Sequence, residues 1–172
     1  MKRFIYLPVM IVTLLALIIP SSALAAGATQ FSGVAFYSSP GQCSDPEGAG
    51  SSYSVVMTGA LQGCHYSFIE TATCSPGGGY NETGYEVFVG TYNGQAGTFE
   101  TTYRFTAKWV NCDPSQEITG RCQHPLIDGS GTGVFEGMTG RLDMRDIVVP
   151  GVGGVAFPYR GHFYPVTAGP PG

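Results

Sequence analysis

The segment 98–109 constrains the fold more than any other part of the chain, because its residues alternate between two kinds. One set consists of Phe99, Thr101, Tyr103, Phe105, Ala107 and Trp109, and the other of Thr98, Glu100, Thr102, Arg104, Thr106 and Lys108. Successive side chains of a β-strand point to opposite faces of a sheet. The alternation therefore predicts one long strand with an aromatic face and a polar face. We expect the aromatic face to lie inside, since burial stabilises by about 25 cal/mol per Å² of apolar area.

Seven other segments have the length and residue types of strands, namely 31–37, 53–62, 64–71, 85–92, 131–136, 141–148 and 155–164. Several of the segments between them contain Pro followed by Gly, and one contains Asn followed by Gly, pairs that supply the backbone angles of tight turns. The chain has 26 glycines, and no segment shows a convincing helical period. About eight strands joined in this way predict an all-β fold, either an antiparallel sandwich or a barrel.

Residues 1–25 have the three parts of a secretory signal peptide. Lys2 and Arg3 precede an apolar run over 4–19, and small residues lead to a cleavage site after Ala25. An uncleaved membrane anchor is the alternative, but the run is shorter than the ~20 residues that a membrane span needs. We therefore expect a secreted or extracytoplasmic protein, periplasmic or extracellular. One domain would cover 26–165, and 166–172 would form a flexible tail.

The mature chain is expected to be acidic. Cleavage removes two of the eight basic residues and none of the twelve acidic ones, which leaves a formal charge of −6. So few cations cannot neutralise many phosphates, which argues against nucleic acid as a partner. No second apolar run of similar length follows, so we expect no stable membrane insertion after cleavage.

Two glycine-containing segments share one pattern. Residues 92–99 and 135–142 both read aromatic-x-Gly-x-x-Gly-x-apolar. Glycine permits the positive φ angles of a tight reversal. The pattern predicts that the chain uses one hairpin design twice.

Three segments together resemble a known family: FETTYRF (99–105), GSGTGVFEGMTGRLDMRDI (129–147) and FPYRGHFY (157–164). They are similar to the barrel of plant allene oxide cyclases, to the related dirigent proteins and to their uncharacterised bacterial secreted relatives. The resemblance covers roughly 85–164. It implies a single antiparallel β-barrel of about eight strands, whose lumen holds an oxidised fatty acid in the plant enzymes.

The same resemblance supplies no catalytic residue. In the plant cyclases an acidic residue of the first barrel strand takes part in catalysis, whereas the first predicted strand here, 31–37, contains no carboxylate. The fold alone does not settle function, because a barrel of this size is either filled by its own side chains or holds one small ligand.

Five cysteines in an exported protein predict disulfide-closed loops. The first expected bridge is Cys112 to Cys122, across a loop between neighbouring strands. Cys64 to Cys74 has the same spacing and is the second expected bridge, but Cys43 can replace either partner. One thiol is left over, which is either buried and inert, paired with another molecule, or reactive.

Neither a metal site nor a cofactor site is predicted. Cys112, Cys122 and His124, with His65 or His162 added by the fold, would supply metal ligands. Their spacing argues against it, because zinc sites bring ligands in close pairs and nine residues separate the two cysteines. The glycine run 129–133 lacks the spacing of a nucleophile elbow or a dinucleotide loop, so Ser130 is predicted to be a turn residue. The glycosylation-type triplet 81–83 is predicted to lie in a loop.

The candidate ligand-binding residues are Glu100, Tyr103, Arg104, Arg160 and His162. Alternation places Glu100 and Arg104 on one face of their strand, and Arg160 and His162 on one face of the last strand. Such residues, like Arg141 with Asp143, usually form solvent-facing ion pairs. If the polar face points into the lumen instead, they form a buried polar network and a candidate binding site.

Three function hypotheses follow. The first is non-catalytic binding of a small apolar, aromatic or phenolic ligand, or of a partner. The second is an isomerase or cyclase of the allene oxide cyclase type, and the third is a structural or cell-envelope interaction module with a filled core. A lumen with aromatic and ionisable groups would favour the second, a purely apolar lumen the first, and no cavity the third. Self-association stays open.

Overall fold

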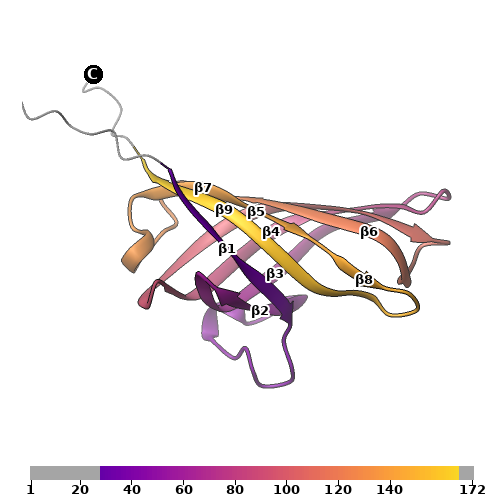
Figure 1. The fold of residues 1–172 in the computed structure, drawn as a ribbon, viewed down its shortest axis with the longest axis horizontal. Coiled ribbons are helices and arrows are strands. Elements are labelled where there is room, and N and C mark those ends of the chain that lie inside the picture. Colours follow the sequence, from indigo (N-terminus) through magenta and orange to yellow (C-terminus); the bar gives the residue numbers. More distant parts are fainter. Residues whose placement is uncertain (1–27, 167–172) are drawn as a thin grey trace, which may run out of the picture.

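The computed structural model describes residues 28–166 (Figure 1). The predicted signal peptide, 1–25, lies outside the described residues, as do 167–172 of the predicted tail. Within 28–166, no helix has the length and apolar character required to cross a membrane.

The described residues contain nine β-strands and two short 3-10 helices. The strands are β1 (Thr29–Tyr37), β2 (Tyr53–Gly59), β3 (Leu61–Cys74), β4 (Gly79–Tyr92), β5 (Gln95–Val110), β6 (Asp113–Pro125), β7 (Met138–Arg145), β8 (Ile147–Val149) and β9 (Gly153–Pro165), and the 3-10 helices are η1 (Pro46–Gly48) and η2 (Gly133–Phe135). The strand order is β1-β2-β3-β4-β5-β6-β7-β9-β8, and β1 also pairs with β9. Every pairing is antiparallel. Eight strands therefore close into a barrel, with β8 as an extra strand on β9, which confirms the predicted fold class.

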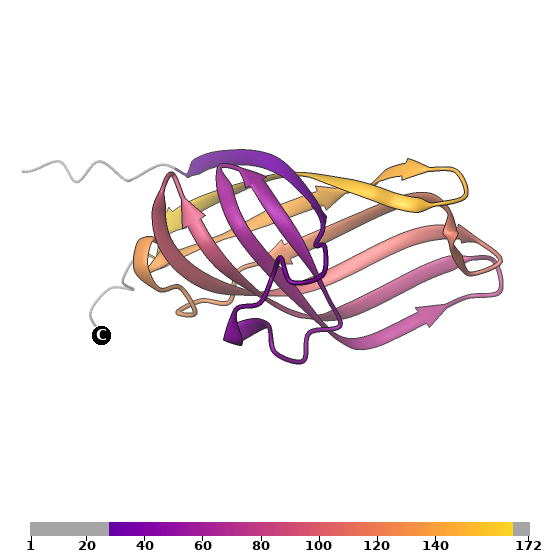
Figure 2. The ribbon, with the colours of Figure 1, turned by 90° about the horizontal axis from the view of Figure 1, so that it is seen from below.

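The two ends of the barrel differ. Strands β4, β5, β6 and β9 extend well past the short β1 and β2, so one wall is longer than the other (Figure 2). The turn between β4 and β5 lies at the short end, and the turn between β5 and β6 lies at the long end. We call the short end, with the β4–β5 turn, the closed end, and the long end, with the β5–β6 turn, the open end.

Aromatic rings fill the closed end. Phe31 stacks on Phe163 with ring centroids 4.2 Å apart, and Phe99 contacts Phe88 at 4.9 Å and Phe135 at 4.8 Å. All five side chains are buried. Phe135 reaches this cluster from η2, because Gly97 lets the η2 segment approach the β5 backbone where a Cβ atom would clash. Burial of each ring stabilises the fold by roughly 1.5–3 kcal/mol.

The predicted alternation of β5 is confirmed. Phe99, Thr101 and Tyr103 are buried in the barrel, whereas Glu100 and Arg104 are exposed. The expectation of solvent-facing ion pairs also holds for Arg141 and Asp143, since Arg141 Nη2 lies 2.9 Å from Asp143 Oδ2 on the outer surface.

Three local predictions were wrong. The predicted strand 131–136 contains the 3-10 helix η2, and the predicted loop 113–121 is most of strand β6. The predicted loop 81–83 lies inside β4. The two loop predictions failed because pairing with neighbouring strands overrides the weak local preferences of glycine and polar residues. The strand prediction failed because Gly133, with a φ of 57°, begins a 3-10 helix instead.

The paired hairpin pattern is half right. Asn93 and Gly94 adopt φ angles of 51° and 80° in the tight turn between β4 and β5, as predicted. The second segment, 135–142, instead leads from η2 through Gly137 into β7. The shared pattern therefore describes one hairpin and one turn that follows a 3-10 helix.

Both predicted disulfide pairings were wrong. The bridges are Cys43 to Cys64 and Cys74 to Cys112, and Cys122 is a free, buried cysteine. Because β6 is a strand, its rise of about 3.3 Å per residue places Cys112 and Cys122 roughly 30 Å apart. A disulfide needs Cα atoms within about 7 Å. The first bridge fastens the segment 38–52 against β3, where Asp45 also accepts a hydrogen bond from Tyr66 at 2.5 Å.

The bridge between Cys74 and Cys112 joins the two turns of the open end. Replacing both with serine removes a cross-link over 38 residues. We expect the free energy of unfolding to fall by about 3 to 5 kcal/mol, because the unfolded chain regains the entropy of the open loop. Urea denaturation of the double variant and the wild type measures this difference.

Peptide mapping without reduction provides the control. Peptides carrying Cys43 and Cys64 should appear linked, and Cys122 should react with a thiol reagent only after unfolding. A linked peptide pair containing Cys122 would contradict the assignment.

Candidate functional site

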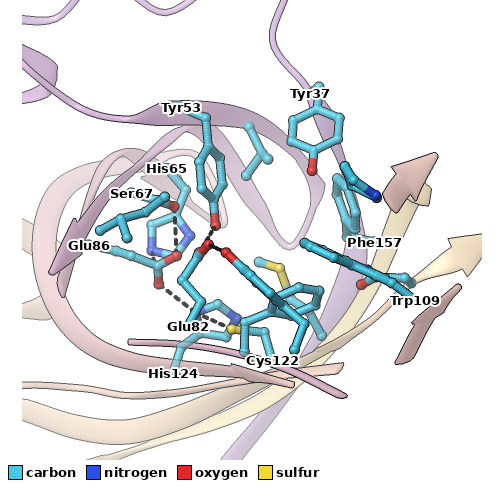
Figure 3. A pocket seen from close by; sticks show the side chains of 17 residues that line it. Tyr37, Tyr53, His65, Ser67, Glu82, Glu86, Trp109, Cys122, His124 and Phe157 are labelled. Atoms are coloured by element: carbon cyan, nitrogen blue, oxygen red, sulfur yellow. Dashed lines mark hydrogen bonds and ion pairs between the residues drawn. The ribbon is translucent and has the colours of Figure 1, made fainter. Parts of the chain in front are cut away.

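A cavity of about 250 Å³ occupies the lumen toward the open end. Figure 3 shows His65, Glu86 and His124 grouped on one side of it, and Tyr37, Trp109 and Phe157 on the other. Its lining consists of Tyr37, Tyr53, Val55, His65, Ser67, Ile69, Tyr80, Glu82, Glu86, Phe105, Trp109, Pro114, Cys122, His124, Met144, Asp146 and Phe157. The lining is thus aromatic, with acidic and histidine side chains set into it.

The polar groups reach the cavity because strand alternation points them inward. Glu82 and Glu86 lie four residues apart on β4 and share its inner face. His65 comes from β3, and Cys122 and His124 come from neighbouring inward positions of β6. The barrel wall therefore holds each side chain on a hydrogen-bonded strand instead of a loop.

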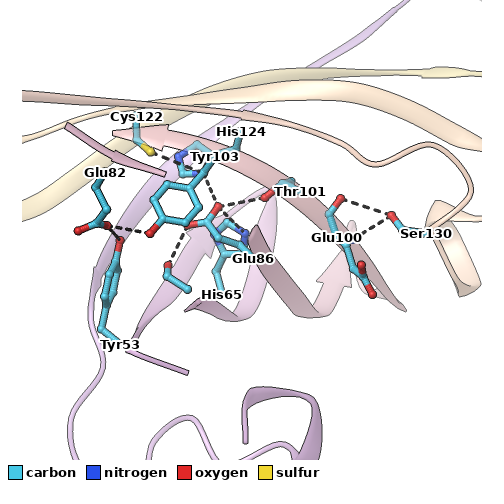
Figure 4. Close-up of polar contacts among 11 residues, drawn as sticks. Tyr53, His65, Glu82, Glu86, Glu100, Thr101, Tyr103, Cys122, His124 and Ser130 are labelled. Atoms are coloured by element: carbon cyan, nitrogen blue, oxygen red, sulfur yellow. Dashed lines mark hydrogen bonds and ion pairs between the residues drawn. The ribbon is translucent and has the colours of Figure 1, made fainter. Parts of the chain in front are cut away.

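Glu86 lies at the centre of the deepest polar group (Figure 4). Its Oε2 atom is 2.5 Å from Nδ1 of His124 and 3.4 Å from Nε2 of His65. Thr101 donates a hydrogen bond to Oε2 at 3.0 Å, and Ser67 donates one to Oε1 at 2.8 Å. Glu86 is 2% exposed and the histidines are 1% and 2% exposed, so this is a fully buried network.

The network holds Glu86 ionised. Burial raises the pKa of this carboxyl, but the charges of His124 and His65 and the hydrogen bonds from His124 and Ser67 outweigh it and bring the pKa to about 2. Burial lowers the pKa of His65 to about 4 despite the attraction of Glu86. His65 is therefore a neutral imidazole beside a carboxylate at neutral pH.

Glu82 forms a second polar group nearer the open end. Its Oε1 accepts hydrogen bonds from Tyr103 at 2.8 Å and Tyr53 at 3.4 Å, and its Oε2 accepts one from Tyr80 at 2.6 Å. Burial, followed by the hydrogen bond to Glu82, raises the pKa of both Tyr80 and Tyr103 above the usual range. The phenols therefore stay protonated and act as donors.

A pair of carboxyl groups lies at the edge of the cavity. Glu117 Oε1 and Asp146 Oδ2 both lie over Gly120, in the space that a Cβ atom would need. Burial, then a hydrogen bond and repulsion from Glu117, raises the pKa of Asp146 to about 8. Asp146 therefore stays protonated at neutral pH.

Two further side chains of the lining, Trp109 and Cys122, take no part in these polar groups. The buried Nε1 of Trp109 has no hydrogen-bond partner among the described residues. Burial raises the pKa of the Cys122 thiol well above its usual range, so this thiol is neutral and unreactive as a nucleophile.

The structure separates the predicted ligand-binding residues. Tyr103 lies in the lumen, with its hydroxyl on Glu82. Glu100, Arg104 and Arg160 are exposed and His162 is half-buried, all on outward-facing positions. The polar face does not point into the lumen, so these four residues do not form the lumen network that was considered.

Sequence reasoning missed the two buried glutamates. A strand extended back to Gly79 would have placed Glu82 and Glu86 on the face of Phe88. The sequence did not show which face of β4 is buried, because Val87 and Val89 make the face opposite Phe88 equally apolar.

Only some of the cysteines and histidines that could have supplied metal ligands lie together in the structure. Cys112 is in a disulfide and His162 lies outside. Cys122 and His124 do come together with His65, however, since Cys122 Sγ lies 3.9 Å from His124 Nδ1 and the two imidazole centroids are 5.6 Å apart.

The sequence matches no protein-family model, and a search of curated proteins finds no significant similarity.

The carboxyl pair predicts a pH-dependent stability. The folded protein keeps the proton of Asp146 up to about pH 8, whereas an unfolded aspartate has a pKa of about 3.9 and loses its proton near that pH. The free energy of unfolding should therefore fall as the pH rises from about 6.5 to 8. Below about pH 6.5 the neutral, buried His65, whose pKa is lowered to about 4, has the opposite effect and offsets that of Asp146 in the wild type. Asp146→Asn should flatten this dependence, as measured by urea denaturation at several pH values.

Asp143→Asn is the matched control, because Asp143 pairs with Arg141 on the outer surface. It should retain the wild-type pH dependence. Equal slopes for Asp146→Asn and the wild type would contradict the raised pKa of Asp146.

Proposed function

We propose that the protein binds one small aromatic or apolar molecule without negative charge in the lumen cavity. The observation that carries this proposal is the lining itself, which combines aromatic rings with buried carboxyl groups. None of the six Lys and Arg residues within 28–166 contributes to it. Binding of this kind is the first of the three hypotheses drawn from the sequence. The aromatic and ionisable lining meets the criterion for the second hypothesis, the isomerase, but binding is placed first because a pKa of about 2 makes Glu86 a weak base.

The aromatic groups favour a flat or apolar ligand. Trp109 stacks on Tyr80 with ring centroids 3.9 Å apart, and Tyr37 contacts Phe157 edge-on at 5.0 Å. Rings arranged in this way bury large apolar area and attract cations to their faces. They support an aromatic or alkyl ligand body, with an ammonium group as a permitted head.

The charges of the lining disfavour an anion. Glu86 is ionised at neutral pH and lines the cavity beside a second buried glutamate, Glu82. Because Glu86 is 2% exposed, water screens its charge poorly, and an anion beside it would be repelled. The carboxylate of a fatty acid therefore has no favourable position in the cavity, which departs from what the resemblance to the plant cyclases implies.

Size and hydrogen bonding narrow the ligand further. The cavity volume of about 250 Å³ is smaller than the roughly 300–1,000 Å³ of pockets for drug-sized ligands. The unpartnered N–H of Trp109 offers one donor to an acceptor group of the ligand. A single-ring or small bicyclic alcohol or phenol fits both features.

Fluorescence of Trp109 provides a direct test, since Trp109 is the only tryptophan of the chain and lines the cavity. The probes are 2-phenylethanol, 2-phenylethylammonium and phenylacetate, which share one ring and differ in charge. We expect the neutral and cationic probes to bind at least about ten-fold more tightly than the anion, a difference of about 1.4 kcal/mol. Equal or tighter binding of phenylacetate would overturn the proposal, as would no saturable change with any probe.

Two glutamate variants locate the binding site. Glu82→Gln removes a carboxylate from the lining, so it should reduce the preference for the cation over the anion. Glu100→Gln changes an exposed carboxylate on the outer face and should leave all three affinities unchanged.

A proton-transfer isomerase or cyclase is the second candidate, because ionisable pairs accompany the aromatic lining. Glu86, a carboxylate at neutral pH, would act as the general base, a weak one because its pKa is lowered to about 2, and Asp146 would act as the acid. The presence of a cavity argues against the third hypothesis, a structural or cell-envelope interaction module with a filled core.

Deuterium exchange tests this candidate. 2-Indanone is a small aromatic ketone with acidic C–H bonds, and in D₂O the protein should speed their exchange as followed by mass spectrometry. Glu86→Gln should reduce the rate by roughly 10²-fold or more, the usual contribution of a general base. A rate that equals that of buffer alone would remove catalysis of this type.

A further inference from the structure

We infer that His65, Glu86 and His124 form a binding site for one divalent first-row transition metal ion, with Zn²⁺ as the simplest case. The three residues offer two imidazole nitrogens and one carboxylate oxygen, all within 4.8 Å of one another. They come from strands β3, β4 and β6, of which β3 and β4 are paired while β5 lies between β4 and β6. This inference does not rest on the proposed organic ligand.

The distances suit a metal centre. Bonds of about 2.0–2.1 Å in tetrahedral geometry place two ligand atoms about 3.3 Å apart. His65 Nε2 and Glu86 Oε2 are already 3.4 Å apart. His124 Nδ1 lies 2.5 Å from Glu86 Oε2 in a hydrogen bond. A metal ion would replace the shared proton there, and the two atoms would separate by under about 1 Å.

His65 provides the second, independent observation. It is 1% exposed, and neither of its ring nitrogens has a hydrogen-bond partner among the described residues. An unpaired buried polar group costs about 1–3 kcal/mol. Its Nε2 lies 3.4 Å from Oε2 of Glu86, and Figure 3 shows the His65 ring beside Glu86 at the cavity, so coordination of a metal would satisfy this nitrogen.

The surroundings also fit a metal ligand set. Ser67 and Thr101 donate hydrogen bonds to the Glu86 carboxylate, which orients it as outer groups orient ligands in metal sites. All three ligand residues line the cavity. A bound ion would therefore keep an open coordination position toward the lumen, the arrangement of sites with two histidines and one glutamate.

A metal was not expected from the sequence, because nine residues separate Cys112 and Cys122; in the structure Cys112 is bonded to Cys74 and takes no part in this group. Cys122 is free and lies 3.9 Å from His124. Its sulfur stands beside the three-residue group and is not part of it. The cysteine is therefore a control in the experiment below.

Isothermal titration of chelator-treated protein with Zn²⁺ tests the inference. We expect one ion per chain with a dissociation constant in the micromolar range or tighter, and no binding of Mg²⁺ or Ca²⁺, which prefer oxygen ligands. His65→Ala should weaken Zn²⁺ binding by at least about ten-fold. His162→Ala, which changes a histidine of the outer surface, should leave binding unchanged.

Two further variants keep the test decisive if His65→Ala folds poorly. His124→Gln keeps a polar group beside Glu86 but lacks the imidazole, so it should also weaken binding. Cys122→Ser should retain one Zn²⁺ ion. In each variant, the shift of the thermal midpoint with Zn²⁺ reports binding to the folded state.

Two results would overturn the inference. Loss of Zn²⁺ binding in His162→Ala or Cys122→Ser with binding retained in His65→Ala and His124→Gln would place the ion elsewhere. No binding by the wild type would exclude the site. Either outcome leaves the fluorescence test of the organic ligand unaffected, because that titration uses metal-free protein.

Discussion

The pairing of β1 with β9 is the contact on which the rest of the structure depends. Seven residues of β1, from Thr29 to Ala35, pair with residues near the end of the described chain, from Phe163 to Phe157. This pairing closes the sheet, and closure creates an inside. Without it, the inner faces of all eight strands would be one side of an open sheet, and the carboxylates on β4 would contact water.

Closure divides the lumen into two unlike halves. The aromatic cluster of the closed end supplies the burial energy, whereas the open end buries Glu82, Glu86 and two histidines. A buried carboxylate is tolerable only when it is paired and hydrogen-bonded. Glu86 meets that condition with four neighbouring groups, and Glu82 meets it with three tyrosine hydroxyls. Such groups lower stability relative to an apolar filling, so their presence points to a role in binding or chemistry.

Much of the fold was predictable because strand alternation is a local signal. The inner face of β5 follows from residues 98–109 alone, and most other strands were placed within a few residues. Strand β6 was missed because Asp113, Pro114 and Gly120 resemble loop residues. Its pairing with β5 and β7 makes it a strand, and the wrong bridge from Cys112 to Cys122 followed from that single error.

By itself, the sequence determined an all-β chain, the turn positions of its clearest hairpin and the aromatic face that is buried, since these depend on neighbours in the chain. Only the tertiary structure decided which cysteines pair and which polar residues meet. His65, Glu86 and His124 are brought together by the register of β3, β4, β5 and β6, and Glu86 and His124 lie 38 residues apart. A shift of one residue in any of these pairings would turn a whole strand's side chains to the other face. That register is set by the closed barrel as a whole, which no single segment encodes.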